Sequence, residues 1–246
     1  MKALKHFLMS PAAMLGLVLL VVIVGLALFA DVLYPRDPLG LAGRPLQWPN
    51  PAGRFLLGTD ASGRDIAAQI AHGARTTLLM GIVSTLIAIA IGIVIGALAG
   101  FYGGLTDDVL MRLTEAFQTL PNFILLLVLV VVVGSNMTAV TIAIGVVSWP
   151  AVARLTRAEF LTRRNREFVQ ACRTLGLTNR WIIFREVLPN ALAPIIVYGS
   201  VVMATAILLE SALAFLDLSD PNIASWGNLI GQGRKVLRSE WYVSAI

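Results

Sequence analysis

Long apolar runs separated by polar segments dominate this 246-residue chain. The runs long enough to cross a bilayer, which takes about 20 residues, are residues 11–30, 76–99, 122–153 and 191–213. The third run is about 48 Å long as one helix, too long for a hydrocarbon core of about 30 Å. Because Gly134-Ser135-Asn136 offers a turn, we predict two spans there, 117–134 and 138–157, the first bending at Pro121. The pattern predicts an all-α integral membrane protein, a polytopic helical bundle with five spans in this chain.

The first run has a competing interpretation as a cleaved signal peptide, since Lys2, Lys5 and His6 precede it. The run is longer than the roughly 7–15 apolar residues of a signal peptide, and Leu28 occupies a position where cleavage after Ala30 would need a small residue. We therefore expect an uncleaved span with a cytoplasmic N-terminus.

Residues 31–75, rich in proline and glycine, form the predicted external loop. The last part of this loop predicts a turn that leads into a short helix within residues 58–75. Thr59, Asp60 or Ser62 is the expected cap of that helix.

Three glycines lie on one face of the second predicted span. Gly92, Gly96 and Gly100 recur every four residues, and small residues at this spacing let another helix approach closely. We expect helix packing at this face, and an end to the helix at Tyr102-Gly103-Gly104.

Arginines gather between residues 154 and 185, where there are eight of them and two acidic residues. Positive residues favour the cytoplasmic side of a membrane. Two spans between residues 117 and 157 place the segment 158–190 inside, whereas one span would place it outside. The arginines therefore support the two-span interpretation.

We call residues 163–189 the elbow, because two short helical patterns meet there at Gly176, which can take the positive φ that ends a helix. Thr178 is the predicted cap of the second helix, and Pro189 its predicted end. The apolar residues are Phe168, Cys172 and Leu175 on one face of the first helix, then Trp181, Ile182, Phe184, Val187 and Leu188. Such a segment either inserts into a groove on a soluble partner or lies on anionic lipid, and composition does not separate these alternatives.

Composition narrows the class of protein further. Hydrophobic residues make up 57% of the chain and charged residues 13%, which excludes an ordinary soluble enzyme. The net charge of +5 comes from arginines that flank apolar runs, so we expect contact with membrane lipid and none with nucleic acid. Cys172 is the single cysteine, and with two distant histidines no metal site is expected. No lysine follows a glycine and precedes Ser or Thr, so the chain has no P-loop and we expect it not to be an enzyme.

The elbow resembles the "EAA" loop of ABC importer permeases, in which Glu-Ala-Ala, three residues, Gly and a later Leu-Pro recur. Ala171, Gly176 and Leu188-Pro189 match this pattern, while Gln170 and Cys172 depart from it. The resemblance implies that the elbow couples the chain to an ATPase. The implied coupling residues are Gln170, Ala171, Cys172, Arg173, Leu175, Gly176, Arg185, Leu188 and Pro189.

Other segments are similar to one branch of that family, the C-type subunit of dipeptide/oligopeptide/nickel permeases. LLGTDASGRDIAAQ carries the branch's external motif, which consists of Gly58, Thr59, Asp60, Gly63, Arg64 and Asp65. Asp217-Leu218-Ser219 replaces the usual Gly-Leu-Gly. The resemblance implies a type I ABC importer permease fold with six spans, so we expect that the sixth is missing here through truncation. It also implies an N-terminal region 1–72, with the first span, external loop and short helix, and a permease domain 73–246.

The same resemblance implies the partners and the location. The partners are a second homologous permease subunit, two ATP-binding subunits and an extracytoplasmic solute-binding protein. The ATP-binding subunits bind ATP and Mg²⁺, so this chain needs no cofactor. The location is a bacterial inner membrane, in which this chain is a multi-pass protein. Peptides or a similar small solute are the expected cargo. Nickel or another small solute is an alternative, as is an ATP-independent secondary transporter or channel, and a non-transporting scaffold is a third class.

Glu210 lies late in the last apolar run. An acid within a span is a candidate for a transport path. It also lies near the predicted outer end, where it could reach interfacial water or cap local backbone.

Overall fold

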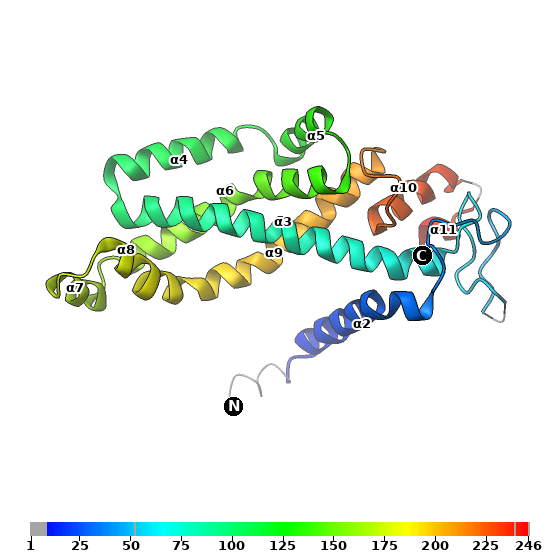
Figure 1. Cartoon of the computed structure of the whole chain (residues 1–246), viewed down its shortest axis with the longest axis horizontal. Helices are drawn as coiled ribbons and strands as arrows, with labels where there is room; N and C mark the ends of the chain where they lie inside the picture. Colours follow the sequence, from blue (N-terminus) through cyan, green and yellow to red (C-terminus); the bar gives the residue numbers. More distant parts are fainter. Residues whose placement is uncertain (1–8, 52, 239, 246) are drawn as a thin grey trace. The chain divides into compact units, whose positions relative to one another are not determined.

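The computed structural model describes residues 9–51, 53–238 and 240–245. These residues are almost entirely helical, and the only β contact among them is an isolated bridge between Thr59 and Asp65. The basic residues Lys2, Lys5 and His6, on which the signal-peptide alternative rests, lie outside the described residues. The helices, labelled in Figure 1, are α2 (Pro11–Leu33), α3 (Ile66–Tyr102), α4 (Gly104–Gln118), α5 (Asn122–Val133), α6 (Met137–Arg163), α7 (Glu167–Thr174), α8 (Asn179–Trp181), the π-helix η1 (Ile182–Val187), α9 (Leu188–Phe215), α10 (Trp226–Val236) and α11 (Tyr242–Ala245).

The chain divides into two compact units. Unit 1 combines residues up to Leu79 with those from Ser211 onward, and unit 2 comprises Met80–Glu210. The long helix α3 begins in unit 1 and ends in unit 2, and α9 begins in unit 2 and ends in unit 1. The predicted division at residue 72 stays a prediction.

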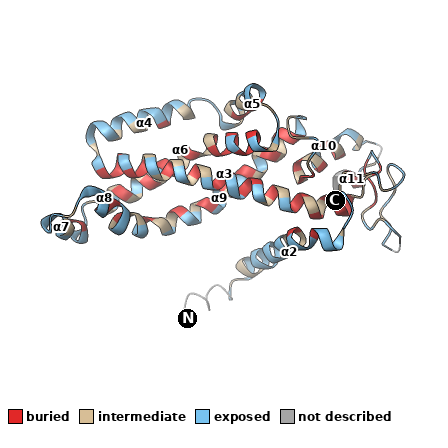
Figure 2. Cartoon of the chain, viewed as in Figure 1, coloured by how far each residue is buried: buried red, intermediate tan, exposed pale blue. Residues whose placement is uncertain are grey.

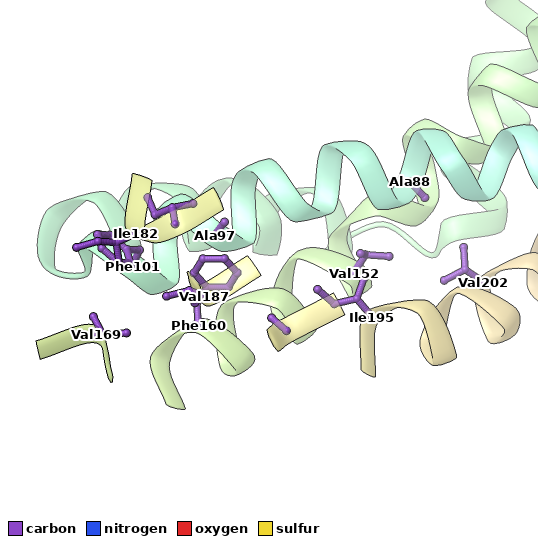
Figure 3. Packing of buried hydrophobic residues seen from close by; sticks show 12 residues of the cluster. Ala88, Ala97, Phe101, Val152, Phe160, Val169, Ile182, Val187, Ile195 and Val202 are labelled. Carbon is purple, nitrogen blue, oxygen red and sulfur yellow. The ribbon is translucent and has the colours of Figure 1, made fainter. Parts of the chain in front are cut away.

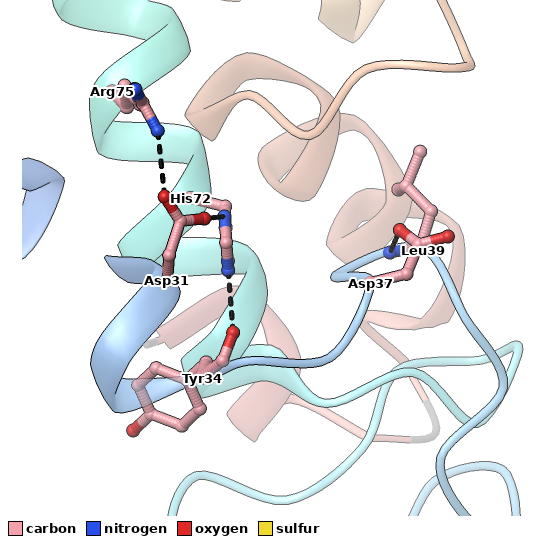
Figure 4. Close-up of polar contacts among 6 residues, drawn as sticks. All are labelled: Asp31, Tyr34, Asp37, Leu39, His72 and Arg75. Carbon is pink, nitrogen blue, oxygen red and sulfur yellow. Dashed lines mark hydrogen bonds and ion pairs between the residues drawn. The ribbon is translucent and has the colours of Figure 1, made fainter. Parts of the chain in front are cut away.

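In unit 1, polar contacts join the end of α2 to the start of α3 (Figure 4). The Asp31 carboxylate accepts a hydrogen bond from Arg75 Nη1 at 3.1 Å and lies 3.8 Å from His72 Nδ1. His72 Nε2 lies 2.9 Å from the carbonyl oxygen of Tyr34, the residue that follows α2. These contacts fix the point at which the chain leaves α2 for the loop.

The later helices of unit 1 pack on the same part of α3. Trp226, the first residue of α10, donates from Nε1 to the Ile70 carbonyl oxygen at 3.0 Å. Tyr242 of α11 is buried with Ile66 and donates its hydroxyl to the Gln47 carbonyl oxygen at 3.0 Å. Residues far apart in sequence thus form one small core around the start of α3.

In unit 2, α3, α6 and the elbow share one hydrophobic core (Figure 3). The side chains drawn there include Phe101 from α3, Phe160 from α6, Val169 from α7 and Val187 from η1. Burial alternates along these helices, with buried faces turned to one another and exposed faces outward (Figure 2). The elbow is therefore part of the packed bundle at the end of unit 2 where α3 ends.

The helices agree with most of the predicted spans. Four are long and apolar enough to cross a membrane, namely α2, α3, α6 and the continuous helical stretch Asn179–Phe215. A fifth is possible if α4 and α5 act as one broken span, and these two helices are bent by 80° at their junction. The prediction of an all-α polytopic bundle is confirmed.

Two details of the predicted spans differ in the structure. The predicted bend at Pro121 is found, but as a break between two helices, because α4 ends at Gln118 and α5, with 12 residues, begins only after Pro121. The missing N–H of proline and its restriction of the preceding residue favour such a break. The predicted short helix within 58–75 is also not separate, since α3 runs from Ile66 to Tyr102 without interruption. It ends as predicted, with Gly103 and Gly104 both at positive φ.

The glycines of α3 lie directly against α6. A Cβ atom added to Gly92 would lie 2.5 Å from Val152 Cβ, and one added to Gly100 would lie 2.7 Å from Phe160 Cβ. At Gly96 the added atom would overlap the backbone carbonyl oxygen of Ala153. Only glycine leaves room for this approach, so α3 and α6 meet backbone to backbone along two turns.

Gly96→Ala should therefore destabilise the protein, because overpacking typically costs about 1–3 kcal/mol. The matched control is Gly25→Ala in α2, where an added Cβ meets no atom within 4 Å. Both changes carry the same gain in helix propensity, about 1 kcal/mol. Thermal unfolding in detergent should show a lower Tm for Gly96→Ala than for the unaltered protein, whereas the Tm of Gly25→Ala should not fall. Equal Tm values would contradict the close approach.

Candidate functional site

The first helix of the elbow ends at Gly176 as the sequence predicts. Gly176 has φ of +76°, and the Leu177 amide donates to the Cys172 carbonyl oxygen at 3.1 Å. The Gly176 amide donates to Arg173 O at 3.0 Å. These bonds close the end of α7 and turn the chain, and the positive φ explains the glycine.

The second helix begins at the predicted cap but does not end at Pro189. The Thr178 hydroxyl oxygen accepts from the Trp181 amide at 3.4 Å. The helix then widens into the π-helix η1 and continues without a break into α9, whose second residue is Pro189. The prediction that Pro189 stops the helix is wrong. A proline ring clashes with the carbonyl four residues earlier in an α-helix, and the wider π-turn just before Pro189 changes that register.

The side of α7 that faces the core differs from the apolar face that the sequence predicts for this first helix of the elbow. Val169, Ile182 and Val187 are fully buried, and Cys172 packs partly against them. Phe168, on the predicted face, is instead exposed, and Leu175 has 77% of its surface exposed. One helix face of α7 thus joins the bundle and the neighbouring one points outward.

Both large apolar side chains and arginines of the elbow are exposed. Besides Leu175, Phe184 is 66% exposed and Trp181 is 37% exposed. The exposed polar neighbours include Gln170, Arg173, Arg180 and Arg185. Exposed apolar groups of this size, rimmed by charge, are typical of a surface that contacts another molecule.

Polar contacts attach the first half of the elbow to the bundle. Arg164 Nη1 donates to the Gly100 carbonyl oxygen at 3.2 Å, and the Arg173 guanidinium lies 5.7 Å from the centre of the Phe101 ring. Arg163 pairs with Glu159 one turn earlier on α6. Together with the buried face, these contacts fix the elbow to the ends of α3 and α6.

The external motif forms the interior of the loop in unit 1. Asp60 is fully buried, and its carboxylate accepts bonds from the amides of Ser62 and Arg64 at 2.8 and 2.9 Å and from Gln69 Nε2 at 3.0 Å. Thr59, also fully buried, donates its hydroxyl to the Arg44 carbonyl oxygen at 2.7 Å.

The glycines of the motif permit close loop contacts. Gly58 and Gly63 have φ near +80°, and a Cβ added to either would overlap a backbone carbonyl oxygen, of Gln47 and Gly43 respectively. The cap of α3 is Asp65, which accepts from the Ala67 amide at 2.9 Å. The prediction that Thr59, Asp60 or Ser62 caps this helix is wrong, because Asp65 takes the cap position, while Thr59 bonds to loop backbone and Asp60 to loop backbone and the Gln69 side chain. The motif holds the loop's shape.

Two acids elsewhere in the chain also have defined surroundings. Glu210 is 2% exposed, so the predicted access of its side chain to interfacial water is not seen. Asp217, at the position where the resembling family has glycine, has φ of +60°, a conformation that Asp tolerates better than most residues. Its hydrogen bond from Lys235 Nζ, at 2.8 Å, lowers the pKa of the Asp217 carboxyl.

Sequence reasoning missed the charges of α4. This helix carries Asp107, Asp108, Arg112 and Glu115, and none of the spans predicted from the sequence includes these residues. Asp107 makes a two-bond ion pair with Arg157 of α6, at 2.5 and 2.6 Å. The helical spacing of apolar and charged residues between 104 and 118 is a sequence signal that could have revealed this helix.

The chain thus combines helices long enough to span a membrane with an elbow whose large apolar side chains are exposed, and comparison with known proteins shows which class has this arrangement. Residues 92–237 match the family described as binding-protein-dependent transport system inner membrane component, and residues 2–49 match the N-terminal transmembrane domain of oligopeptide transport permease C. This chain belongs to the family of binding-protein-dependent transport system inner membrane components.

Relatives and solved structures agree with this assignment. The di/tripeptide permease DppC of Pseudomonas aeruginosa is 37% identical over 98% of this chain and 82% of its own length. The oligopeptide permease OppC of Bacillus subtilis is 32% identical over 96% of this chain and 77% of its own length. Among solved structures, a chain of the inward-facing MetNI methionine ABC transporter superposes with a TM-score of 0.60, covering 72% of this chain and 85% of that chain at 19% identity, which shows a shared fold. The chain is thus a transmembrane permease subunit of an ABC importer, and such a subunit works with ATPase and permease partners.

Removal of the Asp60 carboxylate should destabilise unit 1, because it leaves the buried Gln69 side-chain amide without its acceptor, at about 1–3 kcal/mol for a buried unmet group, and also removes two part-buried bonds from the backbone amides of Ser62 and Arg64. Asp60→Ala should lower the Tm of the purified protein by several degrees. The control is Asp37→Ala, an exposed acid whose carboxylate accepts from the exposed Leu39 amide. A Tm for Asp60→Ala as high as that of the control would show that the buried bonds do not hold the loop.

Proposed function

We propose that this permease imports peptides across the inner membrane of a bacterium. It does so with a second homologous permease subunit, two ATP-binding subunits and an extracytoplasmic solute-binding protein. The relatives with high identity over most of the chain are permeases of di/tripeptide and oligopeptide systems, which supports peptides as the solute. ATP and Mg²⁺ bind to the separate ATP-binding subunits, and this chain contributes the path and the coupling surface.

We infer that the elbow and the N-terminus lie in the cytoplasm. The arginines between residues 154 and 185 support this orientation, because positive residues flank spans on the cytoplasmic side. In this orientation the buried external motif of unit 1 faces the side from which a solute-binding protein delivers its cargo.

The observation that carries the coupling role is the outward surface of the elbow. Leu175, Trp181 and Phe184 are exposed, and so are Arg173 and Arg180 of the same segment. A protein groove that covers the apolar side chains and supplies acidic groups for the arginines would match this surface. The helix–turn–helix shape projects it from the bundle, as docking into a groove requires.

Movement of the elbow reaches the spans through the shared core. Val169 and Val187 belong to the same buried cluster as Phe101 and Phe160, and packed cores transmit displacement because they deform little. Closure of the ATP-binding subunits would therefore tilt α3 and α6 with the elbow. Rocking of this subunit against its homologue then alternates access to the path.

The coupling proposal predicts that Gly176→Leu separates ATP hydrolysis from uptake. A left-handed φ costs a non-glycine residue about 1–2 kcal/mol, so the turn between α7 and α8 should change. In proteoliposomes with the ATP-binding subunits and the binding protein, dialanine uptake should fall about tenfold or more, while ATP hydrolysis continues.

The matched control is Gly176→Asn, because asparagine tolerates this conformation and no atom lies within 4 Å of an added Cβ. It should keep most uptake. Full dialanine uptake by Gly176→Leu at a normal membrane level would contradict coupling through the elbow.

A further inference from the structure

Helix α4 has three distinct faces. One packs on the bundle and carries Asp107 and Thr114. The second is exposed and apolar, with Val109 and Leu113. The third is exposed and charged, with Asp108, Arg112 and Glu115. At 3.6 residues per turn, each set falls on one stripe of the helix.

Contacts with α6 show how deep these faces lie. Asp107 pairs with Arg157, and farther along α4 the Phe117 ring lies 5.2 Å from the ring of Trp149. α4 therefore runs alongside α6 in the opposite direction (Figure 1), from the end near the elbow toward the middle of that span. Because Glu115 is eight residues beyond Asp107, it lies about 12 Å along the span from the level of Arg157.

A charged face at this depth is costly against lipid. Charged side chains within spans face a water-filled cavity or a paired group. Within residues 9–51, 53–238 and 240–245, neither Arg112 nor Glu115 makes an ion pair. The neighbouring apolar stripe suits lipid or an apolar partner, whereas the charged stripe suits water.

We propose that the charged face of α4 lines the transport path and contacts the charged ends of a zwitterionic solute. The Arg112 guanidinium matches a carboxylate, which it can bind through two parallel hydrogen bonds. The Glu115 carboxylate, one turn away on the same face, matches an ammonium group. A peptide with free termini carries both groups, so this inference rests on the proposed function and assigns α4 to recognition of that solute.

The first test uses single cysteines in a Cys172→Ser background and a negatively charged thiosulfonate reagent that reacts in water. The charged-face variants are Arg112→Cys and Glu115→Cys, and the matched controls on the apolar face are Val109→Cys and Leu113→Cys. In inside-out vesicles with the assembled transporter, we expect labelling at 112 and 115 about tenfold faster or more than at 109 and 113, since the reagent does not enter hydrocarbon. Equal rates on both faces, or faster rates on the apolar face, would overturn the proposal.

Labelling in the presence of dialanine distinguishes two interpretations of α4, as part of a transport path or as a helix on the membrane surface. A solute that contacts this face should slow labelling at 112 and 115, whereas a surface helix would be labelled equally with and without it. Labelling that dialanine does not change would overturn the solute contact.

Transport measurements supply the second test. Arg112→Gln should raise the KM for dialanine about tenfold, because one charged contact is lost. Uptake of dialanine amide, which has no C-terminal carboxylate, should stay unchanged. An equal effect on both peptides would overturn the assignment of Arg112. If the unaltered complex takes up no dialanine, the proposed function fails, and the labelling rates still decide whether the charged face meets water.

Discussion

The close approach of α3 and α6 is the constraint on which the rest of unit 2 depends. Without side chains at Gly92, Gly96 and Gly100, the two backbones meet over two turns. This contact brings the end of α3 beside the end of α6, where Phe101 and Phe160 receive the buried face of the elbow. It also sets Arg157 where it can bind Asp107 of α4. The coupling surface and the charged helix thus both take their positions from one helix pair.

Much of this arrangement could be predicted from sequence because its signals are local. Apolar length marks the spans, glycine spacing marks the contact face of α3, and Gly176 followed by Thr178 marks the turn of the elbow. Each depends on a few neighbouring residues and on the bilayer's thickness. Composition alone could not show whether the elbow docks on a partner protein or lies on lipid. The EAA-like pattern indicated that it docks on an ATPase.

The errors arise where distant contacts outweigh local preference. Proline favours a helix end, yet η1 lets the helix continue through Pro189 because Ile182 and Val187 are held in the core. Thr59 and Asp60 are good cap residues, yet the Thr59 side chain bonds to loop backbone and the Asp60 side chain to loop backbone and to the Gln69 side chain, and Asp65 caps α3 instead. Likewise, the charged residues of α4 gave no sign that this helix packs beside α6. That packing depends on the ion pair of Asp107 with Arg157, which is 50 residues away in the sequence.

The most direct test of the central claim is the side of the membrane to which the elbow is exposed. A cysteine at Leu175, which is 77% exposed, in a Cys172→Ser background can be probed with a membrane-impermeant maleimide. The account predicts no labelling in intact cells, labelling in inside-out vesicles stripped of the ATP-binding subunits, and protection when those subunits are restored. Labelling from outside intact cells, or no protection by the ATP-binding subunits, would contradict it.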